Sequence, residues 1–174
     1  MAGLGIVTTR AMTAADGPAV IEIYQDGIAT GHATFEASAP TFVEWQRGRI
    51  DGSCLIGQID DKIAGFAALS PVSDRCAYQG VAEVSVYVAA WARGKKLGHR
   101  LLLDLIAKSE ALGIWTLQAG IFPENQASIK AHEASGFRRL GVRERIGKMS
   151  YGPMAGTWRN VIQFERRSSV TGIN

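Results

Sequence analysis

Apolar and polar residues repeat along the chain with spacings that predict its secondary structure. The clearest helical spacing lies at 97–112, where Leu97, Leu101 and Leu105 recur four residues apart. β-Branched and aromatic residues at 83–88 predict a strand shortly before this helix. The middle of the chain is therefore predicted to be a strand, a tight turn and a helix.

The same patterns predict elements on both sides of this unit. In the first half we expect a strand at 6–10, a helix from 13 to 28, a short helix at 41–50 and a hairpin of strands at 53–59 and 62–70, which Pro71 ends. In the second half we expect a strand at 114–121, a helix at 125–136, strands at 138–145 and 158–166 with a flexible connection at 147–156, and a frayed end at 168–174. These elements predict the α/β (α+β) fold class.

Length and composition suit one globular domain over residues 1–174, with its core at about 6–167. Of the 174 residues, 47% are hydrophobic and 20% are charged. The net charge of +3 is mild, so a small anionic ligand fits better than nucleic acid.

The two cysteines predict neither a disulfide framework nor a metal centre. Cys54 and Cys76 lie in different contexts and lack the Cys/His spacing of a zinc site. No apolar run approaches the roughly 18 residues of a membrane span, and the start lacks the pattern of a leader. We therefore expect no metal, no membrane contact and a cytoplasmic location.

The turn before the central helix has the chemistry of an anion site. Backbone N–H groups at a helix start lack intrahelical partners and carry a partial positive charge. Gly94 and Gly98 allow a tight turn there, and Lys95, Lys96 and Arg100 add positive charge. A phosphate group is the predicted ligand, although such turns also occur for packing reasons alone.

This stretch resembles the pyrophosphate-binding motif of the GNAT family of N-acetyltransferases, which use acetyl-CoA. The motif reads [Arg/Gln]-x-x-Gly-x-[Gly/Ala], and Arg93 and Gly98 match it, whereas Lys96 stands at the middle glycine. A side chain at that position fits helical backbone but not a positive φ angle. Alternatively, Lys96 can reach the 3′-phosphate of CoA.

A second stretch strengthens the resemblance. The family pattern Asn-x-x-[Ala/Ser]-x-x-[hydrophobic]-[Tyr/His]-x-x-x-Gly-Phe is matched by Asn125, Ser128, His132, Gly136 and Phe137. The resemblance implies a mixed, mostly antiparallel sheet of about seven strands flanked by about four helices. It also implies these acetyl-CoA contacts: Val86, Tyr87, Val88, Arg93, Gly94, Lys95, Lys96, Leu97, Gly98, His99, Asn125 and Ser128.

Within the family, the chain is most similar to the branch that acetylates phosphinothricin, methionine sulfoximine and arsinothricin. Residues 34–36, 70–75, 81–88 and 158–161 carry this resemblance in order. It implies a small amino-acid-like amine as acceptor and a homodimer whose pocket involves a neighbouring subunit.

The reaction needs a group that removes a proton, because an α-amine is mostly an ammonium at pH 7 and attacks only when neutral. Glu83 is the candidate, and its alternative role is a solvated carboxylate or an ion pair. A backbone N–H near Val86 is the candidate for oxyanion stabilisation. His132 replaces the family's general-acid tyrosine, but a histidine there can merely cap or pack. The CoA thiol is also acidic enough to leave unaided.

For the acceptor's acidic groups, Arg75 is the first candidate because a guanidinium binds oxyanions with two parallel hydrogen bonds. It can also be an ordinary surface charge. The resemblance adds further substrate contacts: Phe35, Glu36, Tyr78, Glu83 and Ser85.

The sequence leaves two alternative functions open. One is an acetyltransferase for another amine, such as a protein N-terminus, a lysine or a polyamine, which an acidic pocket would favour. The other is a module that binds CoA or nucleic acid without catalysis. The basic cluster at 93–100 is too short, and too poor in aromatic residues, for the nucleic-acid version.

Overall fold

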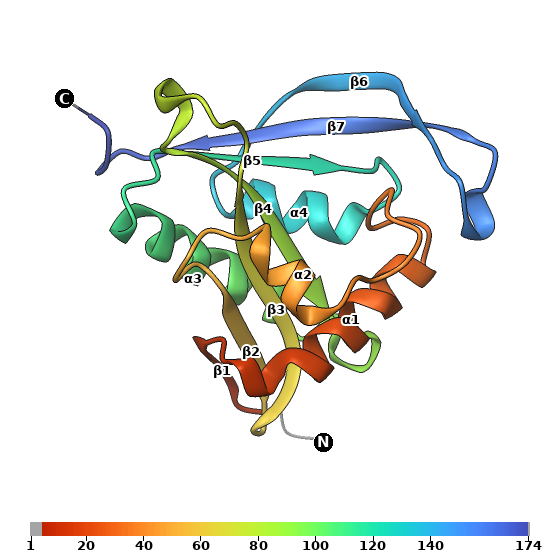
Figure 1. Ribbon diagram of the computed structural model, residues 1–174, viewed down its shortest axis with the longest axis horizontal. Coiled ribbons are helices and arrows are strands. Elements are labelled where there is room, and N and C mark those ends of the chain that lie inside the picture. The colour runs from red at the N-terminus through yellow and green to blue at the C-terminus, as the bar shows by residue number, and fades with distance from the viewer. Residues whose placement is uncertain (1–4, 174) are drawn as a thin grey trace.

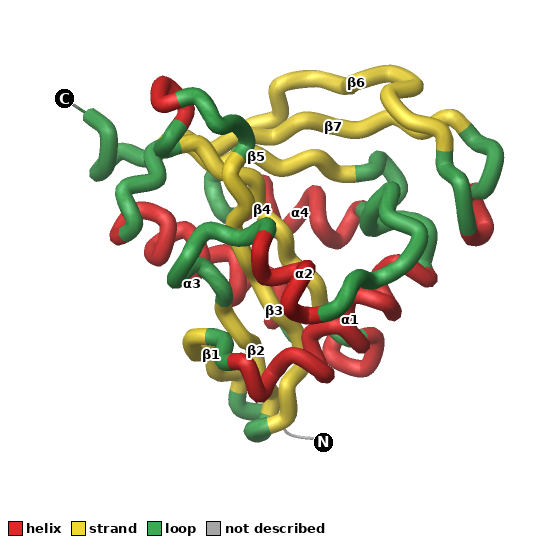
Figure 2. The backbone as a smooth tube through the Cα atoms, in the orientation of Figure 1, coloured by secondary structure: helices red, strands yellow, loops and turns green. Residues whose placement is uncertain are grey.

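Seven strands form one mixed sheet in the computed structural model, which describes residues 5–173. Their order across the sheet is β1-β2-β3-β4-β5-β7-β6, and the parallel neighbours are β4 and β5. The strands are β1 (Val7–Ala11), β2 (Leu55–Ile59), β3 (Lys62–Pro71), β4 (Val81–Val88), β5 (Thr116–Ile121), β6 (Arg138–Lys148) and β7 (Trp158–Arg167). The predicted mixed, mostly antiparallel sheet is confirmed, and Figure 2 shows its long β6–β7 pair extending past the other strands.

Helices cover both faces of this sheet (Figure 1). They are α1 (Gly17–Ala29), α2 (Phe42–Arg47), α3 (Leu97–Ala111) and α4 (Gln126–Ala134). On one face Phe66 stacks on Tyr87 and meets the edge of Trp45 from α2. On the other face Gly65 lies so close to α3 that an added Cβ would be 3.2 Å from Leu101. Neighbouring residues of a strand point to opposite faces, so β3 places α2 and α3 on opposite sides.

The central parallel strands separate along their length, and this separation creates the site. Register pairs between β4 and β5 run only from Val81–Thr116 to Glu83–Gln118. Beyond Glu83, β4 continues to Val88 beside β3 alone, while β5 continues beside β7. N–H directions alternate along an extended strand, and the Ala89 N–H donates toward β3, to Ala64 O at 2.8 Å. The Val86 N–H, an odd number of residues away, therefore faces the gap.

Three expected boundaries need correction. The first helix opens with a 3₁₀ turn at Ala14–Asp16 before α1 begins, because the Asp16 carboxylate accepts from the Thr13 N–H at 2.7 Å and pairs with Arg10. β6 continues to Lys148 through two register shifts, so it is longer than expected and includes the first two residues of the expected connection at 147–156. These shifts keep the strand paired to β7 while adding twist.

The expectation of a frayed end is wrong for residues 168–173. The Ser168 hydroxyl donates to Glu110 on α3 at 2.9 Å, and the Arg167 guanidinium donates to backbone carbonyls of Ser168 and Thr171. These bonds satisfy the tail's polar groups and fix it against α3. Asn174 lies outside the described residues.

Candidate active site

A cavity of about 490 Å³ occupies the gap between β4 and β5. Its walls come from segments far apart in the sequence: the loop after α1, the end of α2, the separated strands, the start of α4 and the β6–β7 pair. The lining residues that carry polar or aromatic chemistry are Tyr24, His32, Phe35, Glu36, Arg49, Ser70, Glu83, Ser85, Tyr87, Phe122, Asn125, Ser128, His132, Arg143 and Gln163.

Two residues of opposite charge, Arg49 and Glu83, line the cavity beside β3 and β4. Glu83 pairs in register with Ser70, and the Ser70 hydroxyl accepts a hydrogen bond from Arg49 Nη1. The Arg49 guanidinium lies 4.5 Å from the centre of the Trp45 ring. Its Nε is buried and makes no hydrogen bond within residues 5–173. Burial lowers the pKa of the Arg49 guanidinium, which stays cationic because its ordinary value is so high.

A buried tyrosine, Tyr24, and a partly buried one, Tyr87, form an aromatic part of the cavity wall. Tyr24 of α1 and Tyr87 of β4 meet edge to face, with ring centroids 5.0 Å apart. Burial raises the pKa of both phenols, so both are protonated near neutral pH. Gly27 makes this packing possible, since a Cβ there would lie 2.7 Å from the Tyr87 ring.

His132 projects from α4 with a defined tautomer. Its Nδ1 lies 2.8 Å from the Ser128 carbonyl oxygen, which can only accept, so Nδ1 carries the proton. Nε2 is then a lone-pair acceptor, and it is buried without a hydrogen-bond partner among the described residues. Burial lowers the pKa of His132, which favours the neutral ring. A neutral ring of this tautomer can accept a proton at Nε2 but cannot donate one there.

The loop at 30–36, which carries Phe35 and Glu36, is held by residues from the second half of the chain. Arg159 is 2% exposed and donates to Gly31 O at 2.7 Å. The Asn125 carboxamide caps α4 by accepting from the Ser128 N–H at 3.2 Å, and it donates to His32 O at 3.3 Å. Asn125 thus connects the start of α4 to this loop.

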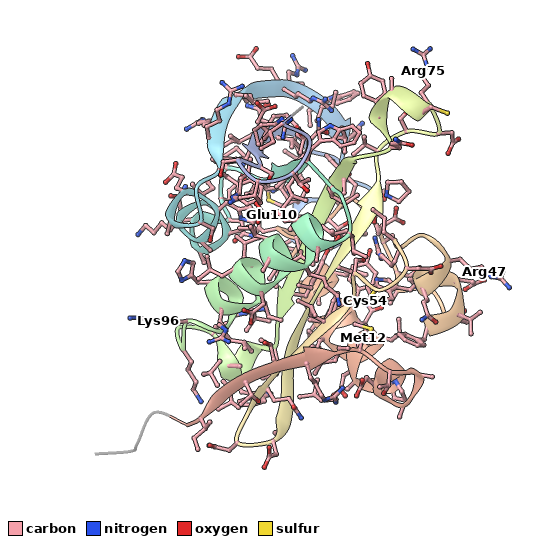
Figure 3. All side chains as sticks on the ribbon, turned by 90° about the vertical axis from the view of Figure 1, so that its left-hand side faces the viewer. Met12, Arg47, Cys54, Arg75, Lys96 and Glu110 are labelled. Atoms are coloured by element: carbon pink, nitrogen blue, oxygen red, sulfur yellow. The ribbon has the colours of Figure 1, made fainter. Side chains whose placement is uncertain are left out.

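In the loop between β4 and α3, the backbone of Gly94 has free space beside it. Gly94 has φ +76°, and a Cβ there would meet no atom within 4 Å. Lys96 also has positive φ, at +62°, directly before α3 begins. This is the conformation for which a side chain was expected to be unfavourable, and it costs a non-glycine residue about 1–2 kcal/mol. In Figure 3 the Lys96 side chain extends away from the body of the protein.

An exposed aromatic residue stands beside this loop. The ammonium groups of Lys62 and Lys95 lie 4.6 and 5.3 Å from the ring centre of Trp91. These cations hold positive potential next to the start of α3.

The structure brings most of the predicted site residues together, but not all. The cavity wall includes the predicted residues Phe35, Glu36, Glu83, Ser85, Val86, Tyr87, Asn125, Ser128 and His132. Val88 and residues 93–99 lie along the end of β4 and the start of α3.

Arg75 and Tyr78 are exposed and do not line the cavity. Figure 3 shows Arg75 pointing outward from the loop between β3 and β4.

Sequence reasoning missed the two arginines that do face the cavity. Arg143 lies on β6, the strand that was expected to end at 145, and Arg49 follows α2. The available signal for Arg49 was its spacing of four from Trp45, which is typical of a stacked pair at a helix end. No local pattern pointed to Arg143.

The described residues hold no cluster of three His, Cys, Asp or Glu side chains that could bind a metal ion. Within residues 5–173 none of the helices has both the length and the apolar character needed to cross a membrane.

A mixed sheet that opens between its central parallel strands, beside a glycine-containing turn at a helix start, is the acetyltransferase architecture expected from the two motifs. The chain belongs to the Acetyltransferase (GNAT) family, whose model matches residues 18–137.

Individual relatives narrow the comparison. The chain is 36% identical over 148 residues to the phosphinothricin N-acetyltransferase of Alcaligenes faecalis, covering 80% of this chain and 74% of that protein. It is 29% identical to an L-methionine sulfoximine/L-methionine sulfone acetyltransferase of Pseudomonas paraeruginosa, covering 77% and 81%. A phosphinothricin acetyltransferase from Sinorhizobium meliloti, solved in complex with AcCoA, superposes with a TM-score of 0.85 at 28% identity, covering 97% of this chain and 91% of that one.

Proposed function

We propose that this chain transfers the acetyl group of acetyl-CoA to the α-amine of a small acidic amino acid, with phosphinothricin, methionine sulfoximine and arsinothricin as candidate acceptors. The observation that carries this proposal is the cavity between β4 and β5, which is lined by a carboxylate, Glu83, and a partly buried guanidinium, Arg49. An amino acid presents the complementary pair of an ammonium and an acid group. The relatives' acceptors are of the same class.

The loop before α3 is the proposed site for the pyrophosphate of acetyl-CoA. Gly94 leaves space for close approach, and the first N–H groups of α3 lack helical partners. Lys95, Lys96 and Arg93 add charge around it. The backbone groups of Val86 and Val88 on β4 face the gap and offer hydrogen bonds to the chain that leads to the thioester.

In the proposed reaction Glu83 takes a proton from the acceptor ammonium, directly or through water. The neutral amine attacks the thioester carbonyl carbon, the carbonyl oxygen becomes an oxyanion, and the Val86 N–H donates to it. The C–S bond then breaks and releases the thiolate of CoA. Nε2 of His132 is unprotonated in the observed tautomer, so a general-acid role requires it to be charged first, which burial opposes.

We further propose a cytoplasmic homodimer that protects the cell from an antibiotic or herbicide acceptor. Exposed apolar side chains on β6 and β7 support self-association: Leu140, Val142, Ile146 and Trp158. Arg75 and Tyr78 remain proposed substrate contacts, and because both lie outside the cavity, either role requires a second subunit or a movement of their loop.

The residues that line the cavity also distinguish the proposed function from two alternatives. A polyamine or lysine acceptor is cationic and calls for several carboxylates without a buried cation, whereas Arg49 and Arg143 line this cavity. A module that only binds CoA would need no carboxylate beside the gap.

The testing experiment measures acetyl-CoA-dependent release of free thiol by the purified protein. The acceptors are phosphinothricin, arsinothricin, methionine sulfoximine, spermidine and a lysine peptide. Turnover confined to the first three supports the proposal and ranks the acceptors. Turnover with spermidine or the peptide alone refutes the acceptor class, and CoA binding without turnover on any amine favours a binding module.

A further inference from the structure

We propose that Arg49 binds the acid group of the acceptor and so selects acidic amino acids, an inference that rests on the function proposed above. Neither the motifs nor the resemblance pointed to this residue. Its position beside Glu83 makes the cavity a receptor for a zwitterion, with one group for each charge.

The first step is the unbalanced state of the Arg49 charge. The guanidinium takes part in none of the ion pairs formed within residues 5–173. Its hydrogen-bond partner is the neutral Ser70 hydroxyl, its Nε is buried without a partner, and one face rests on the Trp45 ring. Partial burial makes a cation that forms no ion pair less well solvated, so its site is suited to an anionic ligand.

The second step is the geometry around that charge. Ser70 and Glu83 are register partners on β3 and β4, and adjacent strands lie about 5 Å apart. Register partners on adjacent strands point to the same face of the sheet, so the Glu83 side chain and the Arg49 guanidinium, which donates to Ser70, lie on the same side of the sheet and both line the cavity. The guanidinium can hold a carboxylate, phosphinate or arsinate through two N–H groups, and the Ser70 hydroxyl is free to donate to the same anion.

The third step is the contrast with the other cavity arginine. Arg143 lies on β6 and is exposed, so water and salt weaken its attraction for an anion. The Arg49 guanidinium stacks on the Trp45 ring and donates a hydrogen bond to the Ser70 hydroxyl. Both contacts restrict its rotamers before a ligand binds. A preorganised, partly buried guanidinium contributes more to binding and specificity than a mobile, exposed one.

The experiment compares Arg49→Gln with Arg47→Gln, a matched control two residues earlier. Figure 3 shows Arg47 pointing away from the protein, and it is exposed. The acceptors are methionine sulfoximine, whose acid group is its carboxylate, and the carboxamide of the same compound. We expect Arg49→Gln to raise KM about 10- to 100-fold for the acid, consistent with loss of a charge-assisted hydrogen bond. The KM values for the carboxamide and for acetyl-CoA should change less than about threefold.

A structural role for Arg49 would give a different pattern. Equal weakening of the acid and the carboxamide, or kinetics indistinguishable from those of Arg47→Gln, would overturn the inference. Arg49→Lys keeps the charge without the planar fork, so it should give an intermediate KM for the acid. If Arg49→Gln does not fold, the lysine variant supplies the test, and a normal KM for the acid in that variant counts against bidentate binding.

The wild-type protein separates the two levels of the proposal. If wild type acetylates methionine sulfoximine and Arg49→Gln does so equally well, the inference fails while the proposed function stands. If wild type acetylates only spermidine or the lysine peptide, the proposed acceptor class fails and the inference fails with it. Thermal melting adds an independent readout: methionine sulfoximine should raise the melting temperature of wild type and Arg47→Gln, but not of Arg49→Gln.

Discussion

Two arginines, Arg159 and Arg49, differ in the hydrogen-bond partners that the protein gives their guanidinium groups. Arg159 on β7 donates to Gly31 O at 2.7 Å, to His32 Nδ1 at 3.0 Å and to Glu124 at 3.1 Å. Its guanidinium also lies 4.0 Å from the Phe122 ring centre. Arg49 is stacked in the same manner on an indole, yet its hydrogen-bond partner is one neutral hydroxyl.

We infer from this difference in partners that Arg159 has a structural role and Arg49 a ligand-binding role. The charge of Arg159 is balanced by a carboxylate and a carbonyl of the protein itself, so it fixes the loop at 30–36 in place. The charge of Arg49 is left for something that is not part of the chain. Burial of a charge alone therefore says little about its role, and the set of partners says more.

The largest expected effect is the loss of turnover when Glu83, the proposed catalytic base, is replaced. Glu83→Gln keeps the shape of the side chain but cannot take a proton, so turnover should fall about 100- to 10,000-fold. Acetyl-CoA affinity and the melting temperature should stay near wild type, because Glu83 forms no ion pair within residues 5–173. Equal loss of turnover and acetyl-CoA binding would instead identify Glu83 as a structural residue.

The second largest expected effect is a loss of folding stability when Arg159 is replaced. Arg159→Met removes the bonds to Gly31, His32 and Glu124, and it should lower the free energy of unfolding by about 2–4 kcal/mol. The control is Arg138→Met, which breaks an ion pair whose arginine side chain is 73% exposed and should change stability by less than about 1 kcal/mol. Urea unfolding measures both. Similar losses in the two variants would remove the distinction between a balanced buried charge and a surface one.

A smaller effect concerns a neutral group of the cavity wall, His132. Burial lowers its pKa in the folded state, so the unfolded chain binds the proton more readily. Its contribution to stability is present above the ordinary pKa of about 6.5 and is lost as the pH falls through the lower folded value. His132→Gln should flatten the decline of unfolding free energy below about pH 6.5, by roughly 1 kcal/mol or less. Above pH 7.5 the two pH profiles should run parallel, and a difference in slope there would point to another group.

An effect of similar size concerns an exposed cation, Lys96. Lys96→Gly removes the charge and the strain of φ +62°, whereas Lys96→Ala removes the charge alone. The glycine variant should be more stable than the alanine variant by about 1 kcal/mol. If Lys96 binds the 3′-phosphate of CoA, both variants should bind CoA more weakly, with a shallower salt dependence. Unchanged CoA affinity in both would leave Lys96 without a role in cofactor binding.

Features encoded by neighbouring residues were predictable. The strand at 83–88, the turn at Gly94 and the apolar repeat of α3 are contiguous, so periodicity and turn chemistry identify them directly. Asn125 as the cap of α4 followed from the same kind of local pattern. The boundaries that failed, at β6 and in the tail after Ser168, depend on bonds to distant residues such as Glu110.

The sequence by itself determined the fold class, the family and the candidate anion-binding stretch, because each rests on motifs of neighbouring residues. Only the tertiary structure decided which arginines line the cavity. Arg75 lies in the segment that resembles the family's substrate loop, yet it points outward, while Arg49 lines the cavity, where it stacks on Trp45 and donates to Ser70 of a distant strand. A side chain's partners depend on packing between segments far apart in the chain, and no local pattern specifies them.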